Sequence, residues 1–235
     1  MEGRFVLGLL ALSCAVPSLA AEADKGFYLG VEFGQSRSDV GLGDALVGQL
    51  GTLIGTSSDK NASAYGAYFG YAVSRHFSIE LSYSNLGEVW YLEEREVTLP
   101  TVPLPMPPFG GGSAVVVPER QQTVIDSESI SLTLIGRFPM TETVFLTGRA
   151  GLAAHLLEAD LRFWFSGNQF ARISGAFDES SAAALVGVGL EWDFHSSWHA
   201  RLQVQQHLML EDEEFPNNVS RGDVTLLSAG LGYRF

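Results

Sequence analysis

Hydrophobic and polar residues alternate along most of the chain with a period of two. In the stretch FSIELSYSN, Phe77, Ile79 and Leu81 fall on one face, and serine and glutamate fall on the other. Eight segments repeat this pattern: 26–34, 64–73, 77–85, 129–138, 144–156, 182–194, 198–210 and 226–235. Such alternation is typical of β-strands with one apolar face, and about ten residues is the length that a tilted strand needs to cross a bilayer.

The connections between these segments also alternate, between short and long. Short turns fall near residues 74, 139 and 195, and long loops are expected at about 36–62, 86–126, 158–179 and 211–222. An even number of strands closes without an unpaired edge, as lipid requires. We therefore predict an all-β fold, an eight-stranded antiparallel up-and-down transmembrane β-barrel with short periplasmic turns and long extracellular loops.

Aromatic residues gather beside the short turns. They are Tyr71, Phe77, Phe138, Trp192, Phe194, Trp198, Tyr233 and Phe235. Aromatic side chains favour the interface between lipid and water, so we expect them to form a girdle at the periplasmic side. The alternative is a water-soluble barrel with its apolar faces turned inward. The sparse charge on the strands, about one charged residue each, favours the membrane barrel.

The first twenty residues have the pattern of a secretory signal peptide. Arg4 precedes an apolar run, and small residues end it at Ser18-Leu19-Ala20. We expect cleavage after Ala20 and a barrel domain over 21–235. A lipoprotein would need Cys14 as its acylated residue, but Ala11 occupies the position where such sites usually have leucine.

Composition narrows the class of protein further. The net charge is −13, which argues against nucleic acid as a partner. The one cysteine lies in the expected signal segment, so disulfide bonds cannot stabilise the mature domain. No mature stretch is a continuous apolar run of the length of a membrane helix.

The order of several motifs resembles a known family. GFYLGVEFGQS, FSIELSYSNLGE, SLTLIGRFPM and DVTLLSAGLGYRF follow one another along the chain. Together they resemble the OmpA-like transmembrane β-barrels of bacterial outer membranes. The resemblance implies outer-membrane localisation and a C-terminal signature, here Tyr233 and Phe235, presented to the barrel-assembly machinery. Since the sequence stops at Phe235, we expect a barrel without a peptidoglycan-binding domain.

Six charged residues fall on the polar faces of the strands, at similar depth. They are Glu32, Glu80, Arg137, Arg149, Glu191 and Arg201. The interior of an eight-stranded barrel is just wide enough for side chains to fill it, and unpaired buried charges are costly. We therefore expect a network of ion pairs that plugs the lumen, and the family resemblance implies the same kind of polar interior.

The sequence contains little evidence for a catalytic site or a metal site. A lipid A deacylase would need a serine two residues after a late-strand histidine, but Met209 follows His207 at that spacing. The five histidines, at 76, 155, 195, 199 and 207, lack the spacing of a metal site. We expect no enzyme activity, no cofactor and no metal, apart from one weak candidate cluster in the last loop. That cluster is Glu211, Asp212, Glu213 and Glu214, where cations that bridge lipopolysaccharide could bind.

These observations favour a monomer with a structural and surface-interaction role, in contact with outer-membrane lipids and lipopolysaccharide. The loops offer surfaces for an unidentified partner, above all the Pro/Gly-rich stretch 100–118. A narrow passive channel for small solutes or ions is the alternative, and a lipid A-modifying enzyme comes third.

Overall fold

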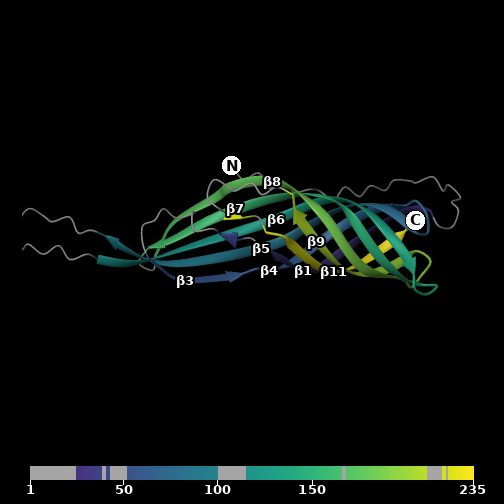
Figure 1. Ribbon diagram of the computed structural model, residues 1–235, viewed down its shortest axis with the longest axis horizontal. Helices are drawn as coiled ribbons and strands as arrows, with labels where there is room; N and C mark the ends of the chain where they lie inside the picture. Colours follow the sequence, from purple (N-terminus) through teal and green to yellow (C-terminus); the bar gives the residue numbers. More distant parts are fainter. Residues whose placement is uncertain are drawn as a thin grey trace, which may run out of the picture.

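The computed structural model describes residues 25–38, 41–42, 52–99, 115–165, 168–210, 219–220 and 222–235. Its wall is a ring of antiparallel strands (Figure 1). The strands of the ring are β1 (Gly26–Ser38), β4 (Asn61–Ala72), β5 (Phe77–Leu99), β6 (Val115–Pro139), β7 (Val144–Phe165), β8 (Asn168–Asp193), β9 (Trp198–Met209) and β11 (Val224–Arg234). Three further strands are β2 (Gly41–Leu42), β3 (Thr52–Asp59) and β10 (Val219–Ser220). The expected signal segment and the cluster at 211–214 lie outside the described residues.

Each strand of the ring pairs with its neighbours in the chain, and the ring closes between its first and last strands. Leu29 faces Tyr233 across this seam, and Ser38 faces Val224. β5 and β6 pair from Phe77 and Gly136 out to Leu99 and Val115. The predicted eight-stranded up-and-down barrel is therefore confirmed. The described part of the chain contains no helix long and apolar enough to cross a membrane.

The half of the barrel nearest the short turns is apolar outside and polar inside. Outward side chains that are about half exposed include Phe33, Phe69, Leu81, Leu132, Leu134, Leu146, Val188, Leu202 and Leu227. Inward side chains that are buried include Ser78, Glu80, Ser131, Thr133, Thr147, Arg149 and Gln203. A soluble barrel would have the reverse arrangement, so this half matches a lipid environment.

The predicted girdle residues lie on the outer face at the short-turn end. Trp198 and Tyr233 have ring centroids 5.1 Å apart, and Tyr233 and Phe235 have centroids 5.2 Å apart. Trp192 and Phe194 make a similar contact at 5.4 Å. These rings mark one edge of the apolar band, as expected at a lipid interface.

Four strands are much longer than the sequence pattern predicts. β5 to β8 have 23, 25, 22 and 26 residues, whereas β4 and β9 have 12 each. The prediction of loops over 86–126 and 158–179 is thus wrong for most of these residues, which continue the sheet beyond the membrane-length portion (Figure 1). The first predicted loop, 36–62, also contains β3, which pairs with the outer part of β5.

In this outer extension, formed by β3 and the outer parts of β5 to β8, the polarity of the two faces is exchanged. The inward side chains of Val89, Tyr91 and Ile125 form a buried apolar cluster, against which Leu157 and Ala159 pack. The outward positions include the exposed charges of Glu88 and Glu158. Apolar groups turn inward where water replaces lipid outside, so the exchange marks the outer boundary of the membrane portion. A pattern with one apolar face per strand does not reveal this exchange.

A β-bulge lies at this boundary on β5. The pairing of β5 with β6 shifts register between Asn85 and Gly87, and Gly87 has a φ of 80°. A Cβ atom at Gly87 would lie 2.5 Å from the Ser63 carbonyl oxygen. Glycine is therefore required both for its backbone conformation and for the close approach of β4.

Candidate functional site

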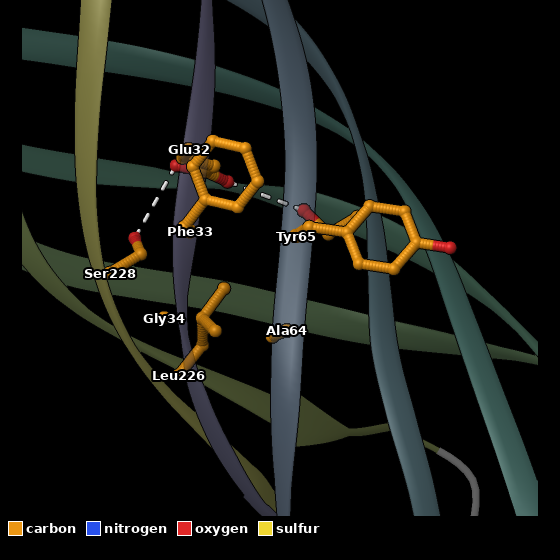
Figure 2. A pocket seen from close by; sticks show the side chains of 8 residues that line it. Glu32, Phe33, Gly34, Ala64, Tyr65, Leu226 and Ser228 are labelled. Atoms are coloured by element: carbon orange, nitrogen blue, oxygen red, sulfur yellow. Dashed lines mark hydrogen bonds between the residues drawn. The ribbon is translucent and has the colours of Figure 1, made fainter.

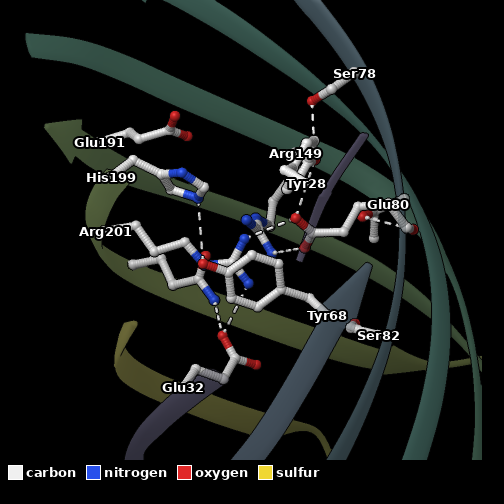
Figure 3. A network of polar contacts seen from close by, with 12 residues as sticks. Tyr28, Glu32, Tyr68, Ser78, Glu80, Ser82, Arg149, Glu191, His199 and Arg201 are labelled. Carbon is white, nitrogen blue, oxygen red and sulfur yellow. Dashed lines mark hydrogen bonds and ion pairs between the residues drawn. The ribbon is translucent and has the colours of Figure 1, made fainter. Parts of the chain in front are cut away.

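The lumen of the membrane portion is crossed by a charged cluster from four strands. Arg201 on β9 donates one hydrogen bond to Glu80 at 2.7 Å and another to Glu32 at 3.2 Å. Arg149 on β7 lies 3.5 Å from the other carboxylate oxygen of Glu80. All four side chains are almost completely buried, and Figure 3 shows them converging from different sides of the barrel. We call this group the central plug.

Neutral groups add hydrogen bonds to the central plug. Gln203 donates to Glu32 at 2.6 Å, and the Tyr28 hydroxyl donates to Glu80 at 3.2 Å. The Arg201 guanidinium carbon lies 3.2 Å from the centroid of the Tyr68 ring, a cation–π contact. A buried charge needs such partners to offset its loss of hydration. The result is a buried, hydrogen-bonded polar layer that joins four strands across the lumen.

A second charged cluster lies nearer the short-turn end. Arg137 donates to Glu191 at 2.7 Å and to Asp193 at 3.1 Å. Arg234 approaches the same carboxylates at 3.4 and 3.5 Å. The Arg137 guanidinium also lies 4.2 Å from the centroid of the Phe145 ring. We call this group the periplasmic cluster.

All six lumen residues singled out from the sequence point into the barrel, but they form two groups instead of one. Glu32, Glu80, Arg149 and Arg201 form the central plug, and Arg137 and Glu191 belong to the periplasmic cluster. Asp193 and Arg234 were not singled out, although alternation places both on inward faces. Strand stagger decides which inward charges share a level, and the sequence pattern does not give the stagger.

His199 is the third residue that sequence reasoning missed. It lies directly opposite Asp193 across the β8–β9 hairpin, and one ligand atom each from Glu191, Asp193 and His199 lie within 4.8 Å of one another. The His199 Nε2 atom is 3.3 Å from the Tyr68 hydroxyl, whereas Nδ1 has no hydrogen-bond partner. The hairpin turn at 195–197 was the signal that could have paired Asp193 with His199.

Two further histidines lie in the lumen, on the side of the central plug that faces the outer extension. His155 Nε2 lies 2.9 Å from His207 Nδ1, and both rings are buried. His207 thus has an imidazole partner in place of the serine that a deacylase would need. A small pocket lies beside Glu32 of the central plug, where β1, β4, β5 and β11 supply its lining, which includes Ala64, Ser84, Leu226 and Ser228 (Figure 2). Its empty volume of about 140 Å³ includes open solvent, so the pocket is not an enclosed ligand cavity.

Carboxylates collect on the outer surface just above the apolar band. Asp126 on β6 lies opposite Glu88 on β5 and Glu158 on β7. Partial burial raises the pKa of Asp126, and the neighbouring charges of Glu88 and Glu128 raise it further. This surface therefore carries a row of acidic side chains across three neighbouring strands.

Comparisons with known proteins extend the structural evidence. The family model described as "Outer membrane protein beta-barrel domain" matches residues 6–235. The N-terminal β-barrel domain of OprF from Pseudomonas aeruginosa is a similar solved structure, with 15% identity and a TM-score of 0.47 over 89% of this chain and 98% of that chain.

Two more solved structures are similar. Ail, the attachment invasion locus protein of Yersinia pestis, has 14% identity and a TM-score of 0.43 over 90% of this chain and 97% of that chain. OprG from Pseudomonas aeruginosa has 14% identity and a TM-score of 0.44 over 89% and 96%. No curated protein sequence matches the chain. The family match spans every strand of the described ring.

Proposed function

Since the chain belongs to the outer membrane protein β-barrel family, we propose that it is a plugged barrel with a structural and surface-interaction role in the bacterial outer membrane. The observation that carries this proposal is the central plug, in which Arg201 joins Glu80 and Glu32 across the lumen. Opening a path would separate buried ion pairs, which costs several kcal/mol. The membrane portion then serves as an anchor.

The outer extension supplies the interacting surface. Its strands continue the barrel wall without a break, and a separate apolar cluster of Val89, Tyr91 and Ile125 supports it from inside. Its outer surface carries the acidic row of Glu88, Asp126 and Glu158. Lipopolysaccharide, whose phosphates bind divalent cations, is the partner that this surface fits best among outer-membrane components.

The plug is tested by single-channel recording on protein refolded into planar bilayers. A shift in gel mobility between boiled and unboiled samples shows that the protein is folded. We expect folded protein to show no steady openings. Reproducible openings in wild-type protein would favour the alternative, a narrow passive channel for small solutes or ions, and would overturn the plugged barrel.

The surface role needs a cellular test. A strain that lacks the protein is complemented with the full chain or with a variant in which Glu88, Asp126 and Glu158 are replaced by glutamine, asparagine and glutamine. Sensitivity to detergent and to a large hydrophobic antibiotic reports membrane integrity. We expect full rescue by the wild type and weaker rescue by the variant at equal surface level. Equal rescue by both would remove the acidic row from the proposed function.

A further inference from the structure

We propose that the periplasmic end of the lumen binds one divalent transition-metal ion, zinc being the best fit, through Glu191, Asp193 and His199. This site is independent of the surface role proposed above. The ligand atoms of the three side chains already lie within 4.8 Å of one another. Zinc binds histidine nitrogen and carboxylate oxygen at about 2.0–2.2 Å, so its ligands stand roughly 3.3 Å apart. Small side-chain rotations would close the remaining distance.

His199 provides the strongest evidence for a ligand. Its side chain is only 2% exposed, and its Nδ1 atom has no hydrogen-bond partner. Figure 3 shows the ring nitrogen that is not bonded to Tyr68 facing the carboxylate of Glu191. Buried polar atoms are nearly always paired in folded proteins. The unpaired Nδ1 atom beside two carboxylates is therefore a ligand atom available to a metal ion.

Tyr68 holds the ring in the orientation that a metal requires. Its hydroxyl lies 3.3 Å from Nε2, and a hydrogen bond donated by Nε2 would leave the lone pair on Nδ1 free for a metal. Histidine ligands usually have such a second partner, which fixes the tautomer and the ring orientation. Tyr68 itself is fixed by its contact with Arg201.

Two arginines compete for the same carboxylates, and they are not equivalent. Arg137 is buried and bonds Glu191 at 2.7 Å. Arg234 is more exposed, with a side-chain exposure of 26%, and its contacts are 3.4 and 3.5 Å long. We infer that a metal ion displaces Arg234 toward the periplasm while Arg137 stays. Removing the Arg234 charge should then strengthen metal binding.

The donor set also defines the class of metal. One imidazole nitrogen and two carboxylates suit zinc and similar borderline ions, whereas calcium and magnesium prefer oxygen ligands alone. Excess calcium should therefore not displace zinc. This distinguishes the site from a nonspecific acidic surface, where calcium would compete.

The test is zinc titration calorimetry on the full refolded chain in detergent micelles, with calcium in excess. His76 and His195 are exposed and are replaced by glutamine in every sample to remove adventitious ligands. We expect about one zinc ion per barrel. The variant His199→Gln should lose this binding. The matched control is His207→Gln, on the same strand and the same inward face, which should retain it.

Three more variants keep the proposal falsifiable if His199→Gln does not fold. Asp193→Asn should weaken zinc binding, Arg234→Gln should strengthen it, and Tyr68→Phe should weaken it about 10-fold. The boiled and unboiled gel assay verifies folding for each. Absence of zinc binding in the folded parent overturns the site. Binding that survives both His199→Gln and Asp193→Asn, or that calcium abolishes, overturns it as well.

Discussion

The membrane portion and the outer extension share strands β5 to β8, but apolar side chains face outward in the first and inward in the second. Along β7, the inward side chains change from Arg149 and His155 to Leu157 and Leu161, and the outward ones change from Leu152 to Glu158. The strand itself continues without a break. Side-chain alternation is thus a property of the backbone, while the solvent outside decides which face is apolar.

Different interactions stabilise the interiors of the two portions. Ion pairs and charge-assisted hydrogen bonds fill the membrane portion, where an unpaired group is expensive. The extension has a small apolar cluster of the kind found in soluble proteins. Substitutions inside the two portions should therefore affect different properties, and four predictions test this, from the largest effect to the smallest.

The largest effect is expected for Arg201→Ala. It leaves Glu80 and Glu32 buried without their shared cation, so the free energy of unfolding should fall by about 3–5 kcal/mol. Urea unfolding in lipid vesicles, followed by tryptophan fluorescence, measures this. Arg149→Ala is the comparison, with a smaller loss, because within the described part of the chain Arg149 forms its ion pair with Glu80 alone, at 3.5 Å. If Arg201→Ala opened the barrel to ions with its stability unchanged, the plug would be a gate.

Ile125→Ala should act on the extension alone. It removes a buried side chain from the apolar cluster, at a cost of about 2–4 kcal/mol in local stability. Hydrogen exchange should speed up in the outer parts of β5 to β7 but remain slow at the membrane level. Equal acceleration in both portions would mean that they unfold as one unit.

Gly87→Ala should weaken the junction between the portions. A positive φ and the close Ser63 carbonyl both oppose a Cβ atom, at about 1–3 kcal/mol. Limited proteolysis should cut the variant near residue 87 faster than the wild type. Gly136→Ala is the matched control, since a Cβ there meets nothing closer than 3.5 Å. Similar cleavage of both variants would contradict a special role for the bulge.

The smallest effect is expected for Asp126→Asn. Burial and the charges of Glu88 and Glu128 raise the pKa of Asp126, so its ionised form destabilises the fold at neutral pH. The variant should gain about 0.2–1 kcal/mol at pH 7. The difference should fade as pH drops through the raised pKa toward the ordinary value, because both states then bind a proton. Urea unfolding over this pH range measures it, and a gain that persists in acid would contradict the explanation.

The sequence predicted the barrel because lipid imposes a strict period of two on membrane strands. Phe77, Ile79 and Leu81 alternate with Ser78 and Glu80 because a strand between lipid and a polar lumen needs one apolar and one polar face. The length of β5 to β8 could not be predicted in this way. Beyond Asn85 the apolar residues lie on the other face of β5, and the bulge at Gly87 shifts the register. The expected pattern therefore ends near Asn85, although the strand continues to Leu99.

The site was predictable in part for a similar reason. Alternation correctly turned Glu80 and Arg201 inward, but their contact depends on how far strands are staggered around the ring. The contact between His199 and Asp193 could have been predicted, since a short turn joins their strands and makes them direct partners. Spacing along the chain identifies histidines that could share a metal ion on a helix or in a loop. It does not identify residues that face each other on opposite strands.

The seam between β1 and β11 has a consequence for how the protein folds. Its cross-strand pairs, such as Leu29 with Tyr233, join residues separated by nearly the whole described chain. Such distant contacts form slowly, because a long segment loses its freedom before the contact stabilises it. Until the final strand arrives, both edges of the sheet lack partners, a state that lipid does not tolerate. Assembly of the wall should therefore be cooperative and late, with insertion and closure completed in one step.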